Sequence, residues 1–406
     1  MSEFNDKLKQ FLHDPIDKCF DIPGHEIRAK RYAELFGVGD VTQDSSSDQI
    51  ASCMERSFLP RATKYGLPAD AFYQPLTEIR HPFSEGKLDV PELDRSEVNK
   101  IFAAFEELFS NLGLPVEDDK KFFYLWRNLV EHSFEKFEGT ELGKYIPILP
   151  ADTRIPDHSI WEHLKVSSAI NSMQMTYDGK TQLLQNNSLF VMSIGPVQSF
   201  ISQARKTQDF FMGSFVLSYL TFRAIEKIVK EYGPTNIIYP DMHGQPLMDH
   251  YLKSLGIEVM NSSEGLVQQP TIPNRFVAIL PFTDRVKIEQ LAKSLEEAVR
   301  NEWHNMACAV LNKFNLLSEI RDDVIEKQNK GFPEVYWAAI PLRKGNFDLL
   351  PSALSDYFEE DEIRRWDELK TFLDDHGDYI VNVGLLYQLA YSALEKSMGA
   401  RKNLRD

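Results

Sequence analysis

One transition constrains the fold of this chain more than any other feature: near residue 189 a helical texture gives way to a short apolar strand that leads into a long helix. Residues 189–194 read LFVMSI, an apolar run of strand length, and Gly195 and Pro196 follow it. Glycine and proline punctuate regular structure, and proline suits the first turn of a helix. We therefore predict one continuous helix over residues 197–231.

Three more strands and a second helix complete this mixed region. The further strand candidates are residues 237–239, 276–280 and 335–340, and a helical pattern covers residues 286–313. The order β-α-β-β-α-β is that of the ferredoxin-like fold. We expect an α+β chain with this fold over residues 186–345.

The regions on either side are predicted to be helical. Apolar residues recur at helical spacing over residues 99–112 and 121–134, and again over 361–400. The predicted organisation is a helical domain over residues 1–175, the ferredoxin-like domain, and a helical segment over 346–406.

Composition excludes several classes of protein. The 406 residues carry 45 Lys and Arg against 61 Asp and Glu, a net charge of −16, so the chain is not a basic protein that coats nucleic acid. Its three cysteines, Cys19, Cys53 and Cys308, form no CxxC pair, which excludes a disulfide scaffold and a cysteine-built zinc site. The polar N-terminus lacks a signal-peptide pattern, and no apolar run approaches the roughly 20 residues of a membrane span. We expect a cytoplasmic protein with no membrane partner.

The first candidate site is the adjacent pair His13 and Asp14, followed by the helix-stopping Pro15. Imidazole binds transition metals and a carboxylate can bridge two of them, so the pair suits one or two divalent cations. His25 and Asp48 are candidate further ligands. The alternatives are a chance His-Asp pair and an N-cap role for Asp48. Lys18 and Glu26 are interpreted as solvated charges.

A second polar cluster contains Asp157, His158 and His163. If Ser159 begins a helix, His158 precedes it and His163 lies one turn inside. One interpretation is an N-cap aspartate with a histidine packed on a tryptophan. The other is that His158 or His163 points toward His13 and supports its site.

The strand-turn-helix transition carries a third candidate site. Gly195 and Pro196 would expose backbone N–H groups at a helix N-terminus, which favours phosphate. On one continuous helix, four polar residues would form a stripe, namely Gln198, Ser202, Arg205 and Asp209. A solvated helix face is the alternative. The segment between the second and third strands offers one carboxylate, Asp241, and the chain has no GGDD motif. A two-metal nucleotidyl transferase needs paired carboxylates, so this domain can at most bind a nucleotide and should not polymerise alone.

Several collinear motifs resemble the large subunit of type III CRISPR effector complexes, Cmr (III-B) branch. The two specific motifs are LPADTRIPDHSIWEHLKVSSAI and GPVQSFISQARKTQDFFMGSFVLSYL; the less specific ones are LHDPIDK, GHE, SDQIASCMER and PNRFVAILP. The match is collinear and extends over nearly the whole chain.

The resemblance implies a helical HD-type nuclease domain that cleaves single-stranded DNA, followed by palm domains of ferredoxin-like fold. It makes His13 and Asp14 the catalytic pair, holding Mn or Ni together with Asp48 and His25. The second polar cluster, Asp157, His158 and His163, is a candidate support of this site. The resemblance also implies Mg-ATP at the palm and conversion of ATP to cyclic oligoadenylate. The nucleotide-binding candidates are Gly195, Gln198, Arg205, Asp209, Ser214 and Asp241.

The implied partners are the other subunits of the complex, crRNA and target RNA. Two departures stand out: Lys18 comes one place later than in the commoner HDxGK form, and the family's cysteine zinc site and GGDD palm are expected after residue 406. Two rival interpretations are a non-catalytic, ATP-binding scaffold with a decayed HD site, and an HD phosphohydrolase acting on nucleotides.

Overall fold

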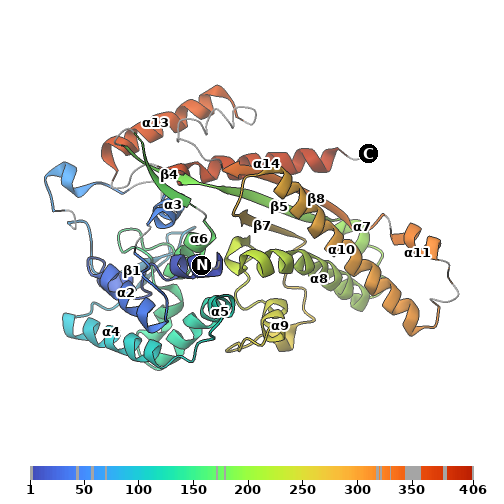
Figure 1. Ribbon diagram of the computed structural model, residues 1–406, viewed down its shortest axis with the longest axis horizontal. Helices are drawn as coiled ribbons and strands as arrows, with labels where there is room; N and C mark the ends of the chain where they lie inside the picture. The colour runs from blue at the N-terminus through green and yellow to red at the C-terminus, as the bar shows by residue number, and fades with distance from the viewer. Residues whose placement is uncertain are drawn as a thin grey trace. The chain divides into compact units, whose positions relative to one another are not determined.

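The protein is described by a computed structural model, which divides into two compact units (Figure 1). Unit 1 comprises Met1–Asn186, Ile257–Met260 and Leu342–Ala390, and unit 2 comprises Asn187–Gly256, Asn261–Pro341 and Tyr391–Asp406. The structure describes residues 3–42, 45–55, 59–68, 71–170, 172–177, 180–316, 320, 322–329, 331–342, 358–377 and 382–404. The three predicted functional domains stay predictions.

Unit 1 is mainly helical, and both helices predicted in its middle are confirmed. Its α-helices are α1 (Glu3–Phe11), α2 (His25–Leu35), α3 (Ser46–Glu55), α4 (Arg95–Ser110), α5 (Asp118–Lys136), α6 (Ile160–Ala169) and α13 (Glu360–His376). Short 3-10 turns are η1 (Lys18–Phe20), η2 (Ala62–Tyr65), η3 (Gly143–Ile148) and η7 (Val383–Leu386).

The start of α4 and the core behind it follow from local chemistry. Asp94 caps the helix by accepting from the Glu97 backbone N–H, while the Glu97 side chain accepts from the Asp94 N–H, a capping box. Phe105 and Phe109 on this helix are buried, and Phe109 packs edge-on against Tyr32 of α2 at 4.8 Å between ring centroids. Aromatic burial therefore holds α2 against α4.

Two antiparallel hairpins in unit 1 were not predicted from the sequence. The first pairs β1 (Glu78–Arg80) with β2 (Lys87–Asp89), and the second pairs β3 (Ser172–Tyr177) with β4 (Lys180–Gln185). The strands of the first hairpin have three residues each and carry too little alternation to be read as strands.

Unit 2 contains a four-stranded sheet whose order is β6-β7-β5-β8. The strands are β5 (Asn187–Gly195), β6 (Ile237–Tyr239), β7 (Arg275–Leu280) and β8 (Glu334–Leu342), close to the four predicted positions. Because β5 and β6 both run antiparallel to β7, they share one direction. Their carboxyl ends therefore lie at the same edge of the sheet.

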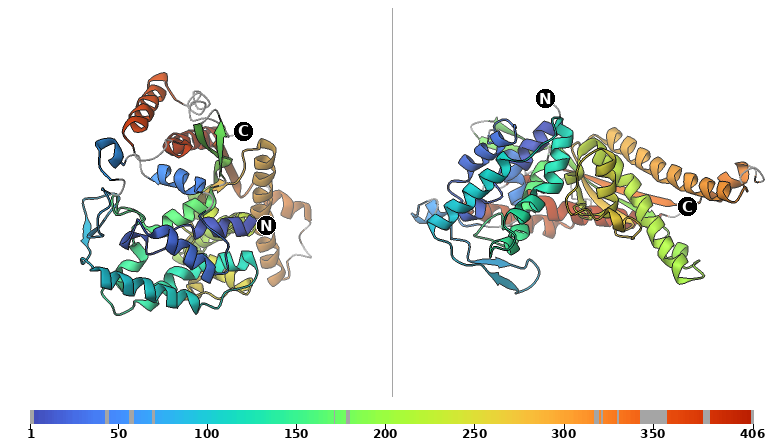
Figure 2. Two further views of the ribbon diagram at one scale, coloured as in Figure 1. Left: turned by 60° about the vertical axis from the view of Figure 1, so that its left-hand side comes forward. Right: turned by 90° about the horizontal axis from the view of Figure 1, so that it is seen from below.

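Helix α8 packs against this sheet, and α10 packs against α8 (Figures 1 and 2). The helices are α7 (Val197–Ile201), α8 (Thr207–Tyr232), α9 (Pro246–Ser254), α10 (Arg285–Lys313), α11 (Asp322–Asn329) and α14 (Tyr387–Asn403), with 3-10 turns η4 (Pro234–Asn236) and η5 (Glu264–Leu266). On α14, Lys402 donates to the Ser193 hydroxyl of β5 at 3.0 Å.

The prediction of one continuous helix over residues 197–231 is wrong. The helix stops after Ile201 and restarts at Thr207, with Lys206 extended between them. Phe200 stacks on Phe332 at 4.5 Å, and α7 folds back so closely that a Cβ on Gly213 would lie 3.7 Å from the Phe200 ring. Tertiary packing of Phe200 therefore overrides the helical preference of the connecting residues, and the predicted polar stripe is divided between two helices.

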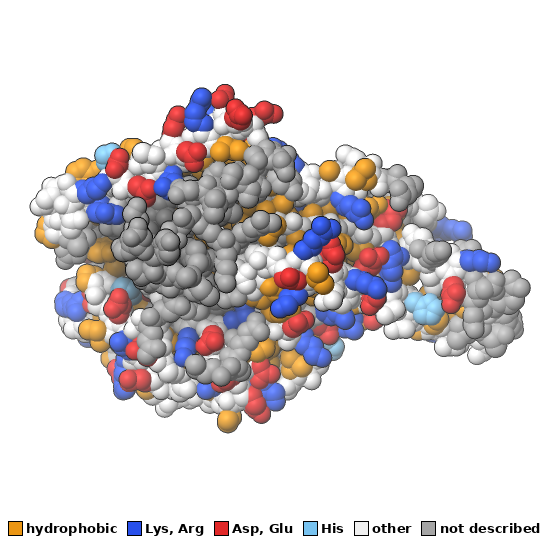
Figure 3. All heavy atoms as spheres, turned by 45° about the horizontal axis from the view of Figure 1, so that its top comes forward, with side chains coloured by type: hydrophobic (Ala, Val, Ile, Leu, Met, Phe, Trp, Pro, Cys, Tyr) orange, Lys and Arg blue, Asp and Glu red, His pale blue; other side chains and the backbone are white. Residues whose placement is uncertain are grey.

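The mixture of helix and sheet confirms the α+β class. The predicted C-terminal helical pattern is matched by α13 and α14, whereas residues 346–357 of that segment lie outside the described residues. Among the helices that the structure describes, none is long and apolar enough to cross a bilayer. On the face drawn in Figure 3, basic and acidic side chains are interspersed rather than segregated by sign.

Candidate metal centre

Three helical elements of unit 1 bring four metal-binding side chains to one point. His13 and Asp14 follow the end of α1, Asp48 lies in the first turn of α3, and His163 lies in the first turn of α6. Helix α6 packs against both α1 and α3, so it carries His163 to the other three. One ligand atom from each of the four residues lies within 4.8 Å of all the others.

The individual distances are short and uniform. His163 Nε2 lies 3.2 Å from Asp48 Oδ1 and 3.4 Å from Asp14 Oδ2. His13 Nε2 lies 3.4 Å from Asp14 Oδ2 and 3.7 Å from Asp48 Oδ1. Bonds of about 2.1 Å in tetrahedral geometry separate neighbouring ligand atoms by about 3.4 Å, so the donor set fits a divalent transition ion.

The outer nitrogen of each imidazole is held in place. His13 Nδ1–H donates to the Gln10 carbonyl oxygen at 2.6 Å, and His163 Nδ1–H donates to Glu55 Oε2 at 2.8 Å. These contacts select the tautomer whose Nε2 carries a lone pair toward the centre, as metal-ligating histidines usually require. The two Nε2 atoms face each other at 3.3 Å, and two lone pairs at that distance call for a proton or a cation between them.

Electrostatics favour positive charge at the same point. Burial by itself would lower the pKa of His13, but Asp14 and Asp48 outweigh burial and raise that pKa to about 9. Burial likewise opposes charge on His163, yet Glu55, Asp14 and Asp48 hold the pKa of His163 well above its ordinary value. The pKa values of Asp14 and Asp48 lie well below the ordinary range despite burial, because Lys18 and His13 act on Asp14 and the two histidines act on Asp48.

The centre is mostly buried and opens to solvent at Asp48. Asp14 and His163 are almost fully buried, whereas 27% of the Asp48 side chain is exposed. His25, the first residue of α2, is partly exposed and lies with Nε2 3.6 Å from Asp14 Oδ1; its Nδ1–H donates to the Ile22 carbonyl at 2.5 Å. His25 therefore sits beside the four-residue cluster, with a lone pair available to a further ligand position.

The second polar cluster divides into one residue at the centre and two behind it. Ser159 caps α6 by accepting from the Glu162 N–H, so the N-cap aspartate interpretation of Asp157 is wrong. His158 Nδ1 bonds Asp157 at 2.8 Å, and its Nε2 lies 3.6 Å from Glu55 Oε2. The expectation that His158 or His163 points toward His13 therefore holds for His163, whereas His158 reaches the centre only through Glu55.

Two residues were misjudged or missed by sequence reasoning. Lys18, interpreted as a solvated charge, is mostly buried and bonds Asp14 Oδ2 at 2.5 Å. Glu55 was not considered, although it follows Asp48 by seven residues and so lies on the same face of α3. Asp48 is within the first turn of that helix, which begins at Ser46, and is not its N-cap. Asp14 and Lys18 lie four residues apart across a non-helical turn, so helical spacing gave no signal for their pairing.

The predicted nucleotide-binding residues of unit 2 are not gathered in the same way. Gln198, Arg205, Asp209 and Asp241 are exposed, and Ser214 donates to the carbonyl of Phe210 within α8. The Arg205 N–H donates to the Asp209 carboxylate at 3.3 Å, which joins two of the six residues at the start of α8. Gly195 ends β5 and Asp241 follows β6, so both lie at the same edge of the sheet. Their role with a nucleotide stays a prediction.

Known proteins resemble both the sequence and the fold. Residues 189–308 match the family model described as CRISPR-associated protein Cmr2, N-terminal. The CRISPR system Cmr subunit Cmr2 of Pyrococcus furiosus is 29% identical over 341 residues, which cover 72% of this chain and 37% of that protein. Cmr2 of Saccharolobus solfataricus is 23% identical over 326 residues, covering 68% of this chain and 29% of that protein. The chain thus spans about a third of the length of these relatives.

A solved structure shares the fold over almost the whole chain. A chain of the type III-B Cmr-beta complex in its apo state superimposes with a TM-score of 0.63 at 17% identity, covering 99% of this chain and 41% of that one. The corresponding complex bound to cognate target RNA gives a TM-score of 0.63 at 16% identity. The motifs, the family model and the curated relatives agree that this chain is similar to the N-terminal portion of Cmr2, the large subunit of type III-B CRISPR complexes, and the solved structures share its fold.

Proposed function

We propose that unit 1 is a metal-dependent HD-type nuclease domain that cleaves single-stranded DNA as part of a crRNA-guided type III effector complex. The observation that carries the proposal is the pair of Nε2 atoms of His13 and His163, 3.3 Å apart, which face Asp14 and Asp48 while their Nδ1–H groups are tied outward.

His13, Asp14, Asp48 and His163 would hold a Mn or Ni ion, with His25 as a further ligand. Such an ion, when bound, lowers the pKa of a coordinated water and stabilises charge on a phosphodiester. The chain's own residues orient and balance the site: Gln10 and Glu55 fix the two imidazoles, and Lys18 offsets the charge of Asp14. Asp48 lies on the open side, where the strand would approach.

For unit 2 we propose a ferredoxin-like palm that binds Mg-ATP and contributes to cyclic oligoadenylate synthesis in the complete complex. The strand order β6-β7-β5-β8 supports the palm fold, and the shared sheet edge of Gly195 and Asp241 supports a nucleotide site there. Protection of residues 195–209 from hydrogen exchange by ATP, with a GGDD-bearing partner palm present, tests this part. Unchanged exchange would contradict it.

The nuclease proposal is tested by strand cleavage. We expect the protein, in the complex with guide and target RNA, to cut single-stranded DNA with Mn²⁺ or Ni²⁺, and the double substitution His13→Ala and Asp14→Ala to abolish cutting. The matched control removes an exposed histidine–carboxylate pair of unit 2, His250→Ala with Glu264→Ala, whose Nδ1–Oε1 distance is 2.8 Å. The control should cut at the wild-type rate.

Two rival functions give different results in the same assays. A scaffold with a decayed site would neither bind the metal nor cut DNA in the intact complex. A nucleotide phosphohydrolase would turn over free nucleotides without guide RNA. The motifs and the sheet of unit 2 are left unexplained by the phosphohydrolase, which makes it the weaker rival.

A further inference from the structure

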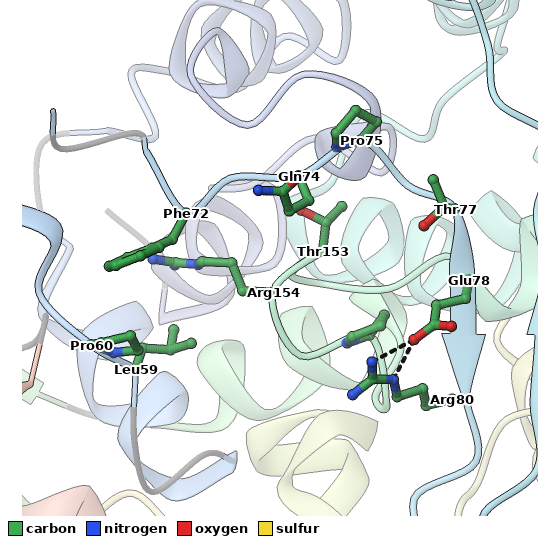
Figure 4. A pocket seen from close by; sticks show the side chains of 11 residues that line it. Leu59, Pro60, Phe72, Gln74, Pro75, Thr77, Glu78, Arg80, Thr153 and Arg154 are labelled. Atoms are coloured by element: carbon green, nitrogen blue, oxygen red, sulfur yellow. Dashed lines mark hydrogen bonds and ion pairs between the residues drawn. The ribbon is translucent and has the colours of Figure 1, made fainter. Parts of the chain in front are cut away.

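Unit 1 contains a second concave site, a cavity of about 340 Å³ that we call the Phe72 pocket. Its walls come from the residues after α3, from the loop before β1, and from the loop before α6. Figure 4 shows Phe72 and Arg154 on one side, Glu78 and Arg80 on the other, and Gln74 and Thr153 between them.

The walls are apolar with a few polar groups, as small-molecule sites usually are. The apolar surface comes from the Phe72 ring, Leu59 and the rings of Pro60, Pro75 and Pro156. Thr153 Oγ1 is buried and has no hydrogen-bond partner among the described residues, and Gln74 offers an amide at the exposed rim. A buried hydroxyl without a partner costs free energy that a ligand's polar edge would recover.

The charges around the pocket decide against a phosphate as its main occupant. Arg154 is held by Asp152, with distances of 2.7 to 3.2 Å, and lies over the Tyr73 ring at 4.4 Å. Arg80 is paired with Glu78 at 2.5 Å. Each guanidinium already faces a carboxylate, so the pocket offers flat surfaces and hydrogen-bonding groups but no excess positive charge. An uncharged aromatic ring with a polar edge fits this chemistry, because such rings stack on aromatic and guanidinium planes.

The pocket is joined to the metal centre by two segments of chain. Pro156 lines the pocket, and His158, two residues later, contacts Glu55 of the centre. Two residues of backbone span at most about 7 Å. Leu59 lines the pocket four residues after Glu55, which holds His163. The pocket is therefore linked to the centre within unit 1 through Pro156, His158 and Glu55.

We propose that the Phe72 pocket holds one unpaired nucleobase of the strand that the metal centre cleaves. The base stacks on Phe72 and bonds Thr153 through its polar edge, which positions a neighbouring phosphodiester at the metal centre. The inference rests on the proposed nuclease function.

The test is a fluorescence-anisotropy titration of the whole chain with labelled oligodeoxythymidylates, in chelator so that no strand is cut. A single abasic position is moved along the strand one nucleotide at a time. For the wild-type chain we expect one position at which the missing base weakens binding about fivefold to tenfold, in line with base–aromatic stacking. Equal effects at every position would overturn the proposal.

Two variants assign the effect to the pocket. Phe72→Leu removes the ring, and Thr153→Val removes the hydroxyl at nearly constant size. In each variant we expect weaker binding of the intact strand and no single position at which an abasic nucleotide weakens binding more than elsewhere. Phe314→Leu, at an exposed phenylalanine that ends α10 of unit 2, is the matched control and keeps that position. Retention of the positional effect in a folded Thr153→Val variant would overturn the assignment even if Phe72→Leu failed to fold.

Two further arms separate the possible outcomes. If free thymidine monophosphate displaces the strand at low concentration and loses this ability in Phe72→Leu, the pocket belongs to a free nucleotide and the strand assignment is overturned. Manganese binding is measured on the same proteins. A chain that binds no metal but shows the positional effect would contradict the nuclease function and support the base-binding pocket. A chain that binds metal but shows no positional effect would support the metal site and overturn the pocket proposal.

Discussion

The two candidate sites of this chain differ in how their residues come together. The metal centre of unit 1 joins His13, Asp48 and His163, which are up to 150 positions apart, at a buried point. The predicted nucleotide site of unit 2 draws most of its residues from one continuous stretch, yet most of them are exposed and α7 and α8 separate them. Buried convergence of distant residues is the stronger indication of chemistry, because each buried charge must be offset by its neighbours.

Substitution of Asp14 is the most direct test of the metal centre and has the largest expected effect. Asp14→Asn removes the charge that faces both imidazoles, and we expect Mn²⁺ affinity to fall by more than about 100-fold, beyond the effect of outer-shell substitutions. A thermal melt in chelator first verifies that the variant is folded. Titration calorimetry then measures the loss of Mn²⁺ affinity. Asp241→Asn in unit 2 is the control and should leave affinity unchanged. Wild-type Mn²⁺ affinity in Asp14→Asn would show that Asp14 is not a metal ligand.

The metal centre should respond to pH in two opposite directions. The pKa of His13 is raised to about 9, so below that pH a bound ion must displace a proton from the imidazole. As the pH is lowered below 9, metal affinity should therefore fall about tenfold per pH unit for each proton displaced. Without metal, the protonated imidazole stabilises the fold fully below pH 6.5, and this contribution is lost as pH rises through 9.

Thermal melting from pH 6 to 9 measures both effects. In chelator the melting temperature should decline toward pH 9, while the increase produced by Mn²⁺ should grow. A metal-induced increase that shrinks as pH rises would contradict the assignment of His13 as a ligand.

A smaller effect is expected from Glu55, which acts on the metal through His163. Glu55→Gln keeps the shape but weakens the hydrogen bond to His163 Nδ1, and metal affinity should fall about 10- to 100-fold. Glu26→Gln, at an exposed position of α2, is the matched control. An unchanged affinity in Glu55→Gln would reduce Glu55 to a packing role.

Substitution of one glycine in each unit compares how tightly the two units are packed. These substitutions have the smallest expected effects, and the effects are on the free energy of unfolding. A Cβ at Gly384 would collide with the Ile50 carbonyl oxygen of α3, so Gly384→Ala should lower the free energy of unfolding by about 1–3 kcal/mol. A Cβ at Gly213 would meet Phe200 at an ordinary 3.7 Å, so Gly213→Ala should raise it by about 0.5–1 kcal/mol through helix propensity. Denaturant unfolding measures both, and destabilisation by Gly213→Ala would mean that α7 lies closer to α8 than the structure has it.

Much of the fold was predictable where local signals were strong. The strands β5 and β7 are apolar runs flanked by glycine and proline, and α5 and α10 have long periodic patterns, so their positions were predicted within a few residues. The hairpin β1–β2 was missed because three-residue strands carry little pattern. The break between α7 and α8 was missed because it depends on Phe200 meeting Phe332, more than 100 residues away.

The candidate metal site was predictable in its members more than in its arrangement. His13, Asp14 and Asp48 were proposed as ligands, whereas His163 was proposed only as support and Glu55 not at all. Lys18 was interpreted as a solvated charge. A lysine is rarely buried unless a carboxylate pairs with it, and its pairing with Asp14 depends on the turn after α1.

The amino-acid sequence by itself determined the resemblance to a known family, the α+β class and the order of most elements, because these follow from motifs, hydrophobic period and turn residues. Only the tertiary structure decided which polar side chains share a point. Packing of α6 against α1 and α3 brings His163 to His13 and Asp48, and the fold-back of α7 divides the stripe that a continuous helix would have displayed. The physical reason is that a local pattern sets the face on which a residue lies, whereas the neighbour of that face is chosen by the burial of apolar surface over the whole unit.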